Sequence, residues 1–171
     1  MKIELDSEAK AIYVRLDSGR VADTFELADA VVLDKAGDGR PLGIEFVHAE
    51  DFEPFLREHP NLVSIPSRLR YESLDKSKTW QVETGMDGDG TDGTGAVDNL
   101  ALNARFIGEV IADSSTLDAI PEGSVVVLTP GGEGAASEAR PDLTDRLSRQ
   151  GHDVVVRLLG VPISASRQAL S

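Results

Sequence analysis

A glycine-rich segment between a predicted strand and a predicted helix is the first place where this sequence could bind a ligand. Backbone amides in such a connection can hold a phosphate. The segment matches neither of the two common glycine-rich phosphate-binding patterns, it contains no lysine, and Glu133 would repel an anion. We therefore expect a plain connection and keep small-ligand or nucleotide binding as the alternative. The candidate residues for that alternative are Thr129, Gly131, Gly132 and Gly134.

A second glycine-rich segment, residues 83–97, carries oxygen ligands that would suit a hard cation. Asp87, Asp89 and Asp98 have the spacing of the first, third and twelfth positions of an EF-hand calcium loop. However, Asp92 stands where that loop needs glycine for its sharp turn, and no helix is predicted before the segment. Because the segment has almost nothing to bury, we interpret it as a flexible linker and keep these four aspartates as candidates for a metal site.

The remaining polar candidates for metal binding or acid–base catalysis do not form a recognised pattern. The histidines have no zinc-ligand spacing, and the paired carboxylates lie in predicted turns, where aspartate binds backbone amides. Cysteine is absent, and no serine lies in a nucleophile motif. We therefore expect a protein that is not an enzyme and has no cofactor. These weaker candidates are His48, His59 and His152, and the pairs Asp6 with Glu8 and Asp34 with Asp38.

The charge of the chain limits the partners that it could bind. Its 171 residues contain 30 acidic and 17 basic side chains, which gives a net charge of −13. Binding to nucleic acid is therefore not expected, because affinity for phosphates depends on clustered lysine and arginine. Only five of the 17 basic residues are lysine, which fits a halophilic source or a GC-rich genome. No apolar run is long enough for a membrane span and the first residues are too acidic for a signal peptide, so we expect a cytoplasmic protein.

The first 60 residues are predicted to form a small antiparallel β-sheet domain. Apolar residues alternate with polar ones, as in Ile12 and Val14 on one face and Tyr13 and Arg15 on the other. Residues Asp38 and Gly39 predict a type I′ hairpin turn. The expected strands are residues 2–5, 11–16, 21–27, 31–34 and 42–48, followed by a short helix within 51–59 that covers one face of the sheet.

This N-terminal part resembles the domain-of-unknown-function family 2283. The resemblance is carried by Asp6, Glu8, Ala9, Tyr13, Arg15, Leu16, Asp34, Asp38, Gly39, Gly43, Ile44 and Glu45. It implies a small antiparallel β domain with no established catalytic activity. Such proteins are often encoded beside small toxin-like genes, so the resemblance suggests a role as an antitoxin or another partner-binding protein.

After a mixed connector, residues 61–97, the periodicity changes to that of a helix and then of buried strands. We expect Trp80 in this connector to dock on one of two domains. Asp98 is a predicted helix N-cap, and β-branched runs at residues 124–129 and 153–158 predict two strands. The helix between these strands starts at Ser137 or at Pro141, and the strand–helix–strand order predicts a parallel pair. An α-β-α-β domain, residues 98–162, and a tail, residues 163–171, complete the chain.

The C-terminal domain is similar to the domain-of-unknown-function family 5647. Four short stretches carry this similarity: Asn99–Leu102, Ile120 with Pro121, Leu128–Pro130, and residues 151–158. It implies no known activity, cofactor or catalytic residue. The similarity therefore does not assign an enzyme function.

The sequence as a whole predicts a two-domain α+β protein that acts through protein–protein interaction. The predicted parallel strands would leave open edges, which need cover from the N-terminal sheet or from a second copy, so a homodimer is expected. A small basic toxin-like protein is a candidate partner, because opposite charge speeds association. Small-ligand binding at the glycine-rich segment remains the alternative function.

Overall fold

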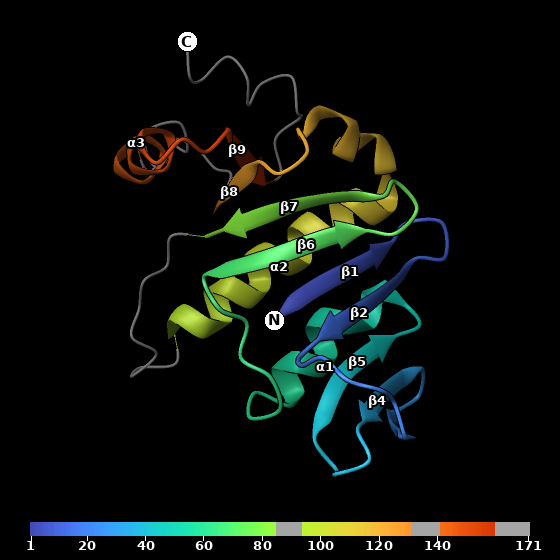
Figure 1. The fold of residues 1–171 in the computed structure, drawn as a ribbon. Helices are drawn as coiled ribbons and strands as arrows, with labels where there is room; N and C mark the ends of the chain where they lie inside the picture. Colours follow the sequence, from blue (N-terminus) through green and yellow to red (C-terminus); the bar gives the residue numbers. More distant parts are fainter. Residues whose placement is uncertain (85–93, 131–140, 160–171) are drawn as a thin grey trace.

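One large mixed sheet runs through the whole protein (Figure 1). The computed structural model describes residues 1–84, 94–130 and 141–159. In these residues the sheet has nine strands in the order β3-β4-β5-β2-β1-β6-β7-β8-β9. The strands are β1 (Lys2–Asp6), β2 (Ala11–Arg15), β3 (Asp23–Ala28), β4 (Val31–Lys35), β5 (Pro41–Phe46), β6 (Arg68–Ser73), β7 (Lys78–Glu83), β8 (Val125–Pro130) and β9 (Val154–Leu159).

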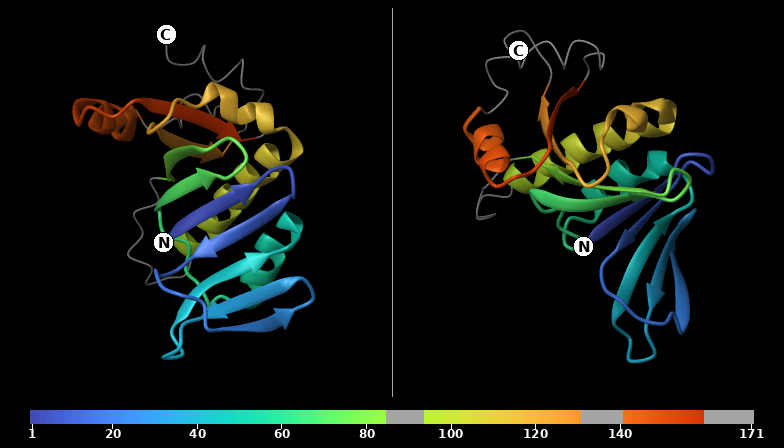
Figure 2. Two further views of the ribbon diagram at one scale, coloured as in Figure 1. Left: turned by 45° about the vertical axis from the view of Figure 1, so that its right-hand side comes forward. Right: turned by 45° about the horizontal axis from the view of Figure 1, so that its top comes forward.

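The helices lie on both faces of this sheet. In Figure 1, α1 (Phe52–Glu58) and α2 (Thr94–Ala112) lie behind it, and the right-hand view of Figure 2 shows α3 (Pro141–Arg149) on the opposite side of β8 and β9. Two short 3₁₀ helices, η1 (Ala49–Asp51) and η2 (Ser114–Ala119), precede α1 and follow α2. No described helix is both long and apolar enough to cross a membrane.

The expectation of a small N-terminal sheet was wrong, because β1 has strand partners on both sides. It pairs antiparallel with β2 and parallel with β6. The β6–β7 hairpin lies in residues that the sequence left unassigned, and β7 pairs parallel with β8. This hairpin therefore joins the N-terminal strands to the C-terminal parallel pair of β8 and β9 in one sheet. The broad α+β class and the predicted parallel pair are confirmed.

Two local predictions at turns and caps were also wrong. The hairpin between β4 and β5 exists, but a type I′ turn needs positive φ at both central residues. Gly39 has φ +85°, whereas the only described non-glycine residues with positive φ are Lys10, Ala30 and Ser77. The N–H of Gly39 donates to Ala36 O at 2.9 Å, which closes a longer turn. Asp98 lies inside α2 and is not its N-cap.

The main core lies between the sheet and the helices α1 and α2. It contains buried residues from β1 through to β9, so it extends across both predicted domains. Trp80 on β7 is 1% exposed; its ring stacks on Tyr71 at 5.6 Å and meets the Phe106 ring of α2 at 6.4 Å. A second core cluster lies on the other face, where Leu143 and Leu147 of α3 pack with side chains of β8 and β9.

Candidate functional site

The glycine-rich candidates do not form a site in the described residues. Gly131, Gly132 and Gly134 lie outside the part of the chain that the structure describes. Thr129 is fully buried on β8, and its hydroxyl donates to the backbone oxygen of Arg157 at 3.4 Å. The threonine side chain therefore lies within the packed β8–β9 pair, and the ligand-binding alternative stays a prediction.

Most of the candidate metal ligands also lie outside the part of the chain that the structure describes. Asp87, Asp89 and Asp92 lie outside the described residues, and Asp98 belongs to α2. Within residues 1–84, 94–130 and 141–159, no three histidine or acidic side chains lie together in a group that could hold a metal ion.

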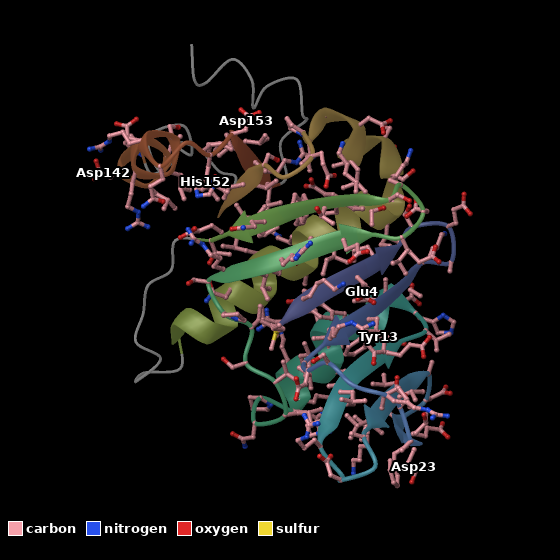
Figure 3. All side chains as sticks on the ribbon, viewed as in Figure 1. Glu4, Tyr13, Asp23, Asp142, His152 and Asp153 are labelled. Carbon is pink, nitrogen blue, oxygen red and sulfur yellow. The ribbon has the colours of Figure 1, made fainter. Side chains whose placement is uncertain are left out.

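The three histidines come from separate parts of the fold. His48 precedes η1, and His152 lies between α3 and β9, beside Asp153 in Figure 3. His59 follows α1, where its ring stacks on Phe55 and its Nδ1 lies 2.9 Å from the backbone oxygen of that residue. This places His59 at the helix end, as the sequence predicts.

Three of the four carboxylates predicted to lie in turns bind neighbouring groups. Asp6 accepts the N–H of Ala9 at 2.8 Å, and Asp38 accepts the N–H of Arg40 at 3.1 Å. Asp34 accepts hydroxyl hydrogen bonds from Tyr13 and Thr24, and Glu8 is exposed. Asp6, Asp34 and Asp38 thus have structural partners, which favours a structural role for both pairs over a catalytic one.

A charged network lies on the sheet face opposite α1 and α2, where Glu4 and Tyr13 are labelled in Figure 3. Glu4 is only 8% exposed and accepts two hydrogen bonds from Arg15, at 2.8 and 3.1 Å. Lys2 lies 2.7 Å from Glu4 and 2.5 Å from Glu72. Because each charge has a partner of opposite sign, this network fits a structural role better than a catalytic one.

Lowering the pH is expected to reduce the stability of the fold, because it protonates the Glu4 carboxylate. Burial raises the pKa of Glu4, but hydrogen bonds from Arg15 and Lys2 outweigh burial and lower that pKa below its ordinary 4.5. The stabilisation is therefore complete above about pH 4.5 and is lost as the pH falls through the lower folded-state pKa. We expect Glu4→Gln to reduce the free energy of unfolding at neutral pH by about 1–3 kcal/mol.

Urea unfolding of Glu4→Gln and wild type at several pH values measures this effect. The difference between the two proteins should shrink in acid. Glu8→Gln, which changes an exposed glutamate in the β1–β2 turn, is the matched control. An undiminished difference at low pH would show that the Glu4 charge is not the source of the stabilisation.

Strand β3 forms one edge of the sheet and is the least covered strand in the described residues. On the face that carries the main core, exposure increases from Ile44 on β5 (0%) through Leu33 on β4 (8%) to Phe25 on β3 (43%). Val21 and Leu27 are also exposed, at 45% and 37%. The apolar surface of the core thus continues to an edge that no described element covers.

The backbone of β3 also has hydrogen-bonding groups that face away from the sheet. The N–H of Val47 donates to Ala30 O, so the backbone groups of Ala30 face β5 and, by alternation, those of Leu33 and Lys35 face β3. Their partners Phe25 and Asp23 therefore face β4, and the N–H groups of Thr24 and Glu26 face outward. The outward N–H of Thr24 donates to the exposed carboxylate of its neighbour Asp23. We define the β3 edge as residues 21–28 with these outward backbone groups. The alternation in residues 21–27 predicts a strand with one buried and one solvent-exposed face. In the structure β3 is exposed on both faces.

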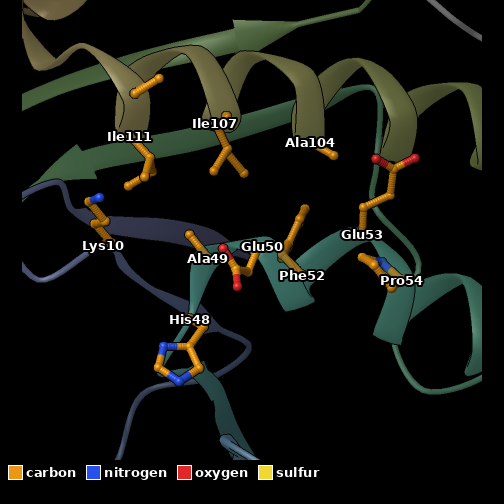
Figure 4. A pocket seen from close by; sticks show the side chains of 12 residues that line it. Lys10, His48, Ala49, Glu50, Phe52, Glu53, Pro54, Ala104, Ile107 and Ile111 are labelled. Carbon is orange, nitrogen blue, oxygen red and sulfur yellow. The ribbon is translucent and has the colours of Figure 1, made fainter.

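A half-open groove of about 490 Å³ lies between α2 and the η1–α1 segment (Figure 4). Its floor is apolar, with Phe52, Ile107 and Ile111. Lys10 and His48 line one part of the rim, and acidic side chains of η1 and α1 line another. The mixed charge of this rim favours no single class of ligand.

The comparisons with known proteins bear on the N-terminal part of the chain. Residues 2–50 match a family described as Protein of unknown function (DUF2283). This match supports the resemblance of the N-terminal strands to family 2283. No curated protein and no solved structure matches the chain. The similarity of residues 98–160 to family 5647 stays a prediction.

Five of the residues that carry the resemblance lie on the face of β2, β4 and β5 opposite α1 and α2. Tyr13 and Asp34 share a hydrogen bond there, Arg15 belongs to the charged network around Glu4, and Gly43 and Glu45 continue the same face. The matched segment also contains the β3 edge. The family similarity therefore covers the part of the protein with the most exposed strand.

Proposed function

We propose that the protein is a non-enzymatic interaction module that binds a protein partner by strand addition at the β3 edge. One observation carries this proposal: β3 is an edge strand that combines outward backbone groups with exposed apolar side chains. Edge strands of this kind add strands from other chains unless they are protected. An antitoxin-like role with a small basic partner is the specific form that we propose.

Strand addition would bury surface that is now in water. A partner strand would accept and donate hydrogen bonds along β3 and would cover Phe25 and Leu27. Full burial of an apolar side chain of this size contributes about 1.5–3 kcal/mol. The two side chains together could therefore supply a substantial part of a binding free energy.

Charge favours a basic partner over a second copy at this edge. Strand β3 contains Asp23 and Glu26 and no basic residue. Antiparallel pairing of two β3 strands would place the acidic face around Glu26 of one copy beside the same face of the other, and like charges on neighbouring strands are destabilising. The homodimer expected from the sequence is therefore not what we propose for the β3 edge.

Replacing Thr24 with proline is expected to abolish partner binding. Proline removes the outward N–H of residue 24 and its ring blocks the approach of an added strand, while the ladder bonds to β4 use Asp23 and Phe25. The measurement is affinity capture of the tagged chain from its native lysate, with the mass and stoichiometry of co-eluting proteins. We expect one basic protein near one-to-one with wild type and a loss of more than about tenfold with Thr24→Pro.

Leu74→Ala is the matched control for this capture. Leu74 is 50% exposed and follows β6, away from the β3 edge. The control should retain the partner as well as wild type does. Equal recovery with wild type and Thr24→Pro, when both are folded by circular dichroism, would contradict strand addition at β3.

A further inference from the structure

We infer that the segment that adds to β3 is an extended strand with cationic side chains on one face and apolar side chains on the other. This inference rests on the proposed function and specifies the chemistry of its partner. It follows from the different character of the two faces of the β3 edge.

One face of the β3 edge carries negative charge that no ion pair in the described residues neutralises. Glu26 lies opposite Val32 of β4, which in turn lies opposite Glu45 of β5, so both glutamates project from the same face. Both are exposed, and no ion pair among the described residues involves either of them. A cationic side chain on an added strand would lie about 5 Å from Glu26.

The other face of the edge is mainly apolar. Phe25 lies opposite Leu33 on this face, and Lys35 Nζ is 4.3 Å from the centre of the Phe25 ring. Lys35 also lies opposite Asp23, so this face already has one charge of each sign. An apolar side chain beside Phe25 would extend the core row formed by Ile44 and Leu33 without adding charge.

The alternation of cationic and apolar residues in the added segment follows from the geometry of β-strands. Successive side chains of an extended segment point to opposite faces of the sheet. A segment that meets both faces of β3 therefore needs cationic and apolar residues in alternate positions. Residues 20–48, which include β3, β4 and β5, contain six acidic residues against Arg20, Lys35 and Arg40, so the surrounding field also favours a cationic strand.

The probe for this inference is a labelled peptide as long as β3 that alternates arginine and valine. Fluorescence anisotropy measures its affinity for the full chain at low salt. Two comparison peptides separate pattern from charge: one has the same composition with all arginines before all valines, and one alternates glutamate and valine. We expect the alternating arginine–valine peptide to bind at least about fivefold more tightly than either.

Two protein variants with the same change in net charge locate the contact. Glu26→Lys should weaken binding of the alternating peptide by about fivefold or more, because attraction becomes repulsion. Glu8→Lys changes an exposed glutamate in the β1–β2 turn, which β4 and β5 separate from β3, and should leave the affinity within about twofold. Thr24→Pro, which removes an outward N–H without changing the charge, should weaken binding by about tenfold or more.

Several results would overturn the inference. Equal affinity for the alternating and block arginine peptides, or equal effects of Glu26→Lys and Glu8→Lys, would show general charge attraction. A dimer in sedimentation equilibrium that Thr24→Pro dissociates would assign the edge to a second copy. Thermal unfolding verifies that each variant is folded, and Glu26→Lys provides the test if Thr24→Pro does not fold.

The two proposals can fail separately. If Thr24→Pro loses the captured partner while the pattern of the peptide has no effect, strand addition stands and the cationic strand is wrong. If Thr24→Pro changes neither capture nor peptide binding, the proposed function fails as well.

Discussion

Replacing Phe106 with alanine is expected to lower the free energy of unfolding by about 3–5 kcal/mol. Phe106 is fully buried on α2, and its ring meets those of Tyr71 and Trp80 at 5.8 and 6.4 Å in edge-to-face geometry. The change removes these contacts and leaves a cavity between α2 and the β6–β7 hairpin. Because this hairpin joins the two parts of the sheet, the loss is expected to affect the whole protein.

Urea unfolding measured by two signals tests this expectation. Trp80 fluorescence reports on the core around Phe106, and far-ultraviolet circular dichroism reports on all strands and helices. The control Leu74→Ala, at a 50% exposed position, should change the free energy by no more than about 0.5 kcal/mol. A Phe106→Ala effect as small as that of the control would contradict the packing described above.

The same experiment tests the predicted division into two domains. The main core includes buried residues from β1 to β9, so we expect the two signals to change together in one transition. Two separate transitions would instead support domains that unfold independently. The prediction of residues 1–60 and 98–162 as separate domains depends on this outcome.

Replacing Gly43 with alanine is expected to destabilise the protein by about 1–3 kcal/mol. The Tyr13 ring lies directly over Gly43, so that an added methyl group would overlap with it. Tyr13 would have to move and would lose its 3.0 Å hydrogen bond to Asp34. Since Asp34 also accepts a bond from Thr24 of β3, the change would disturb the strands beside the β3 edge.

Two readouts distinguish this cause from general damage. Burial, with the hydrogen bond to Asp34, raises the pKa of Tyr13 to about 12, so Gly43→Ala should bring that pKa down toward the ordinary 10 in an ultraviolet titration. In a Tyr13→Ala background the substitution should cost much less. An unchanged cost in that background would place the strain elsewhere.

Gly108→Ala is the matched control and has the opposite expected sign. Gly108 lies in α2, and an added methyl group would meet nothing within 4 Å. Because alanine favours the helix over glycine, we expect this variant to be more stable by about 0.5–1 kcal/mol. Together the two glycine substitutions separate a steric effect from a change in backbone entropy.

Local pattern predicted many individual elements, because strands and helices impose their own periods on neighbouring residues. The alternation of Ile12 and Val14 with polar residues places β2 correctly, and the β-branched run 124–129 places β8. The β6–β7 hairpin was left unassigned, although Leu69, Tyr71, Trp80 and Val82 all lie on its buried face. The charged and polar residues around these positions make the apolar alternation of the hairpin difficult to recognise in the sequence.

The proposed binding edge could be predicted only in part. The sequence indicates an alternating strand at residues 21–27 and an acidic protein that favours a basic partner. It does not indicate that β3 ends the sheet, since Phe25 and Leu27 have the same pattern as residues that are buried in β2 and β5. The candidate phosphate and metal residues remain predictions, as most of them lie outside the described residues.

Composition and local order in the sequence determined the net charge, the absence of cysteine and the positions of most strands. The tertiary structure decided which strands are neighbours. It placed β6 beside β1, left β3 at an edge and laid Tyr13 over Gly43. The reason is physical: periodicity reports contacts between residues a few positions apart, whereas a strand edge is paired or free according to hydrogen bonds with segments far away in the chain.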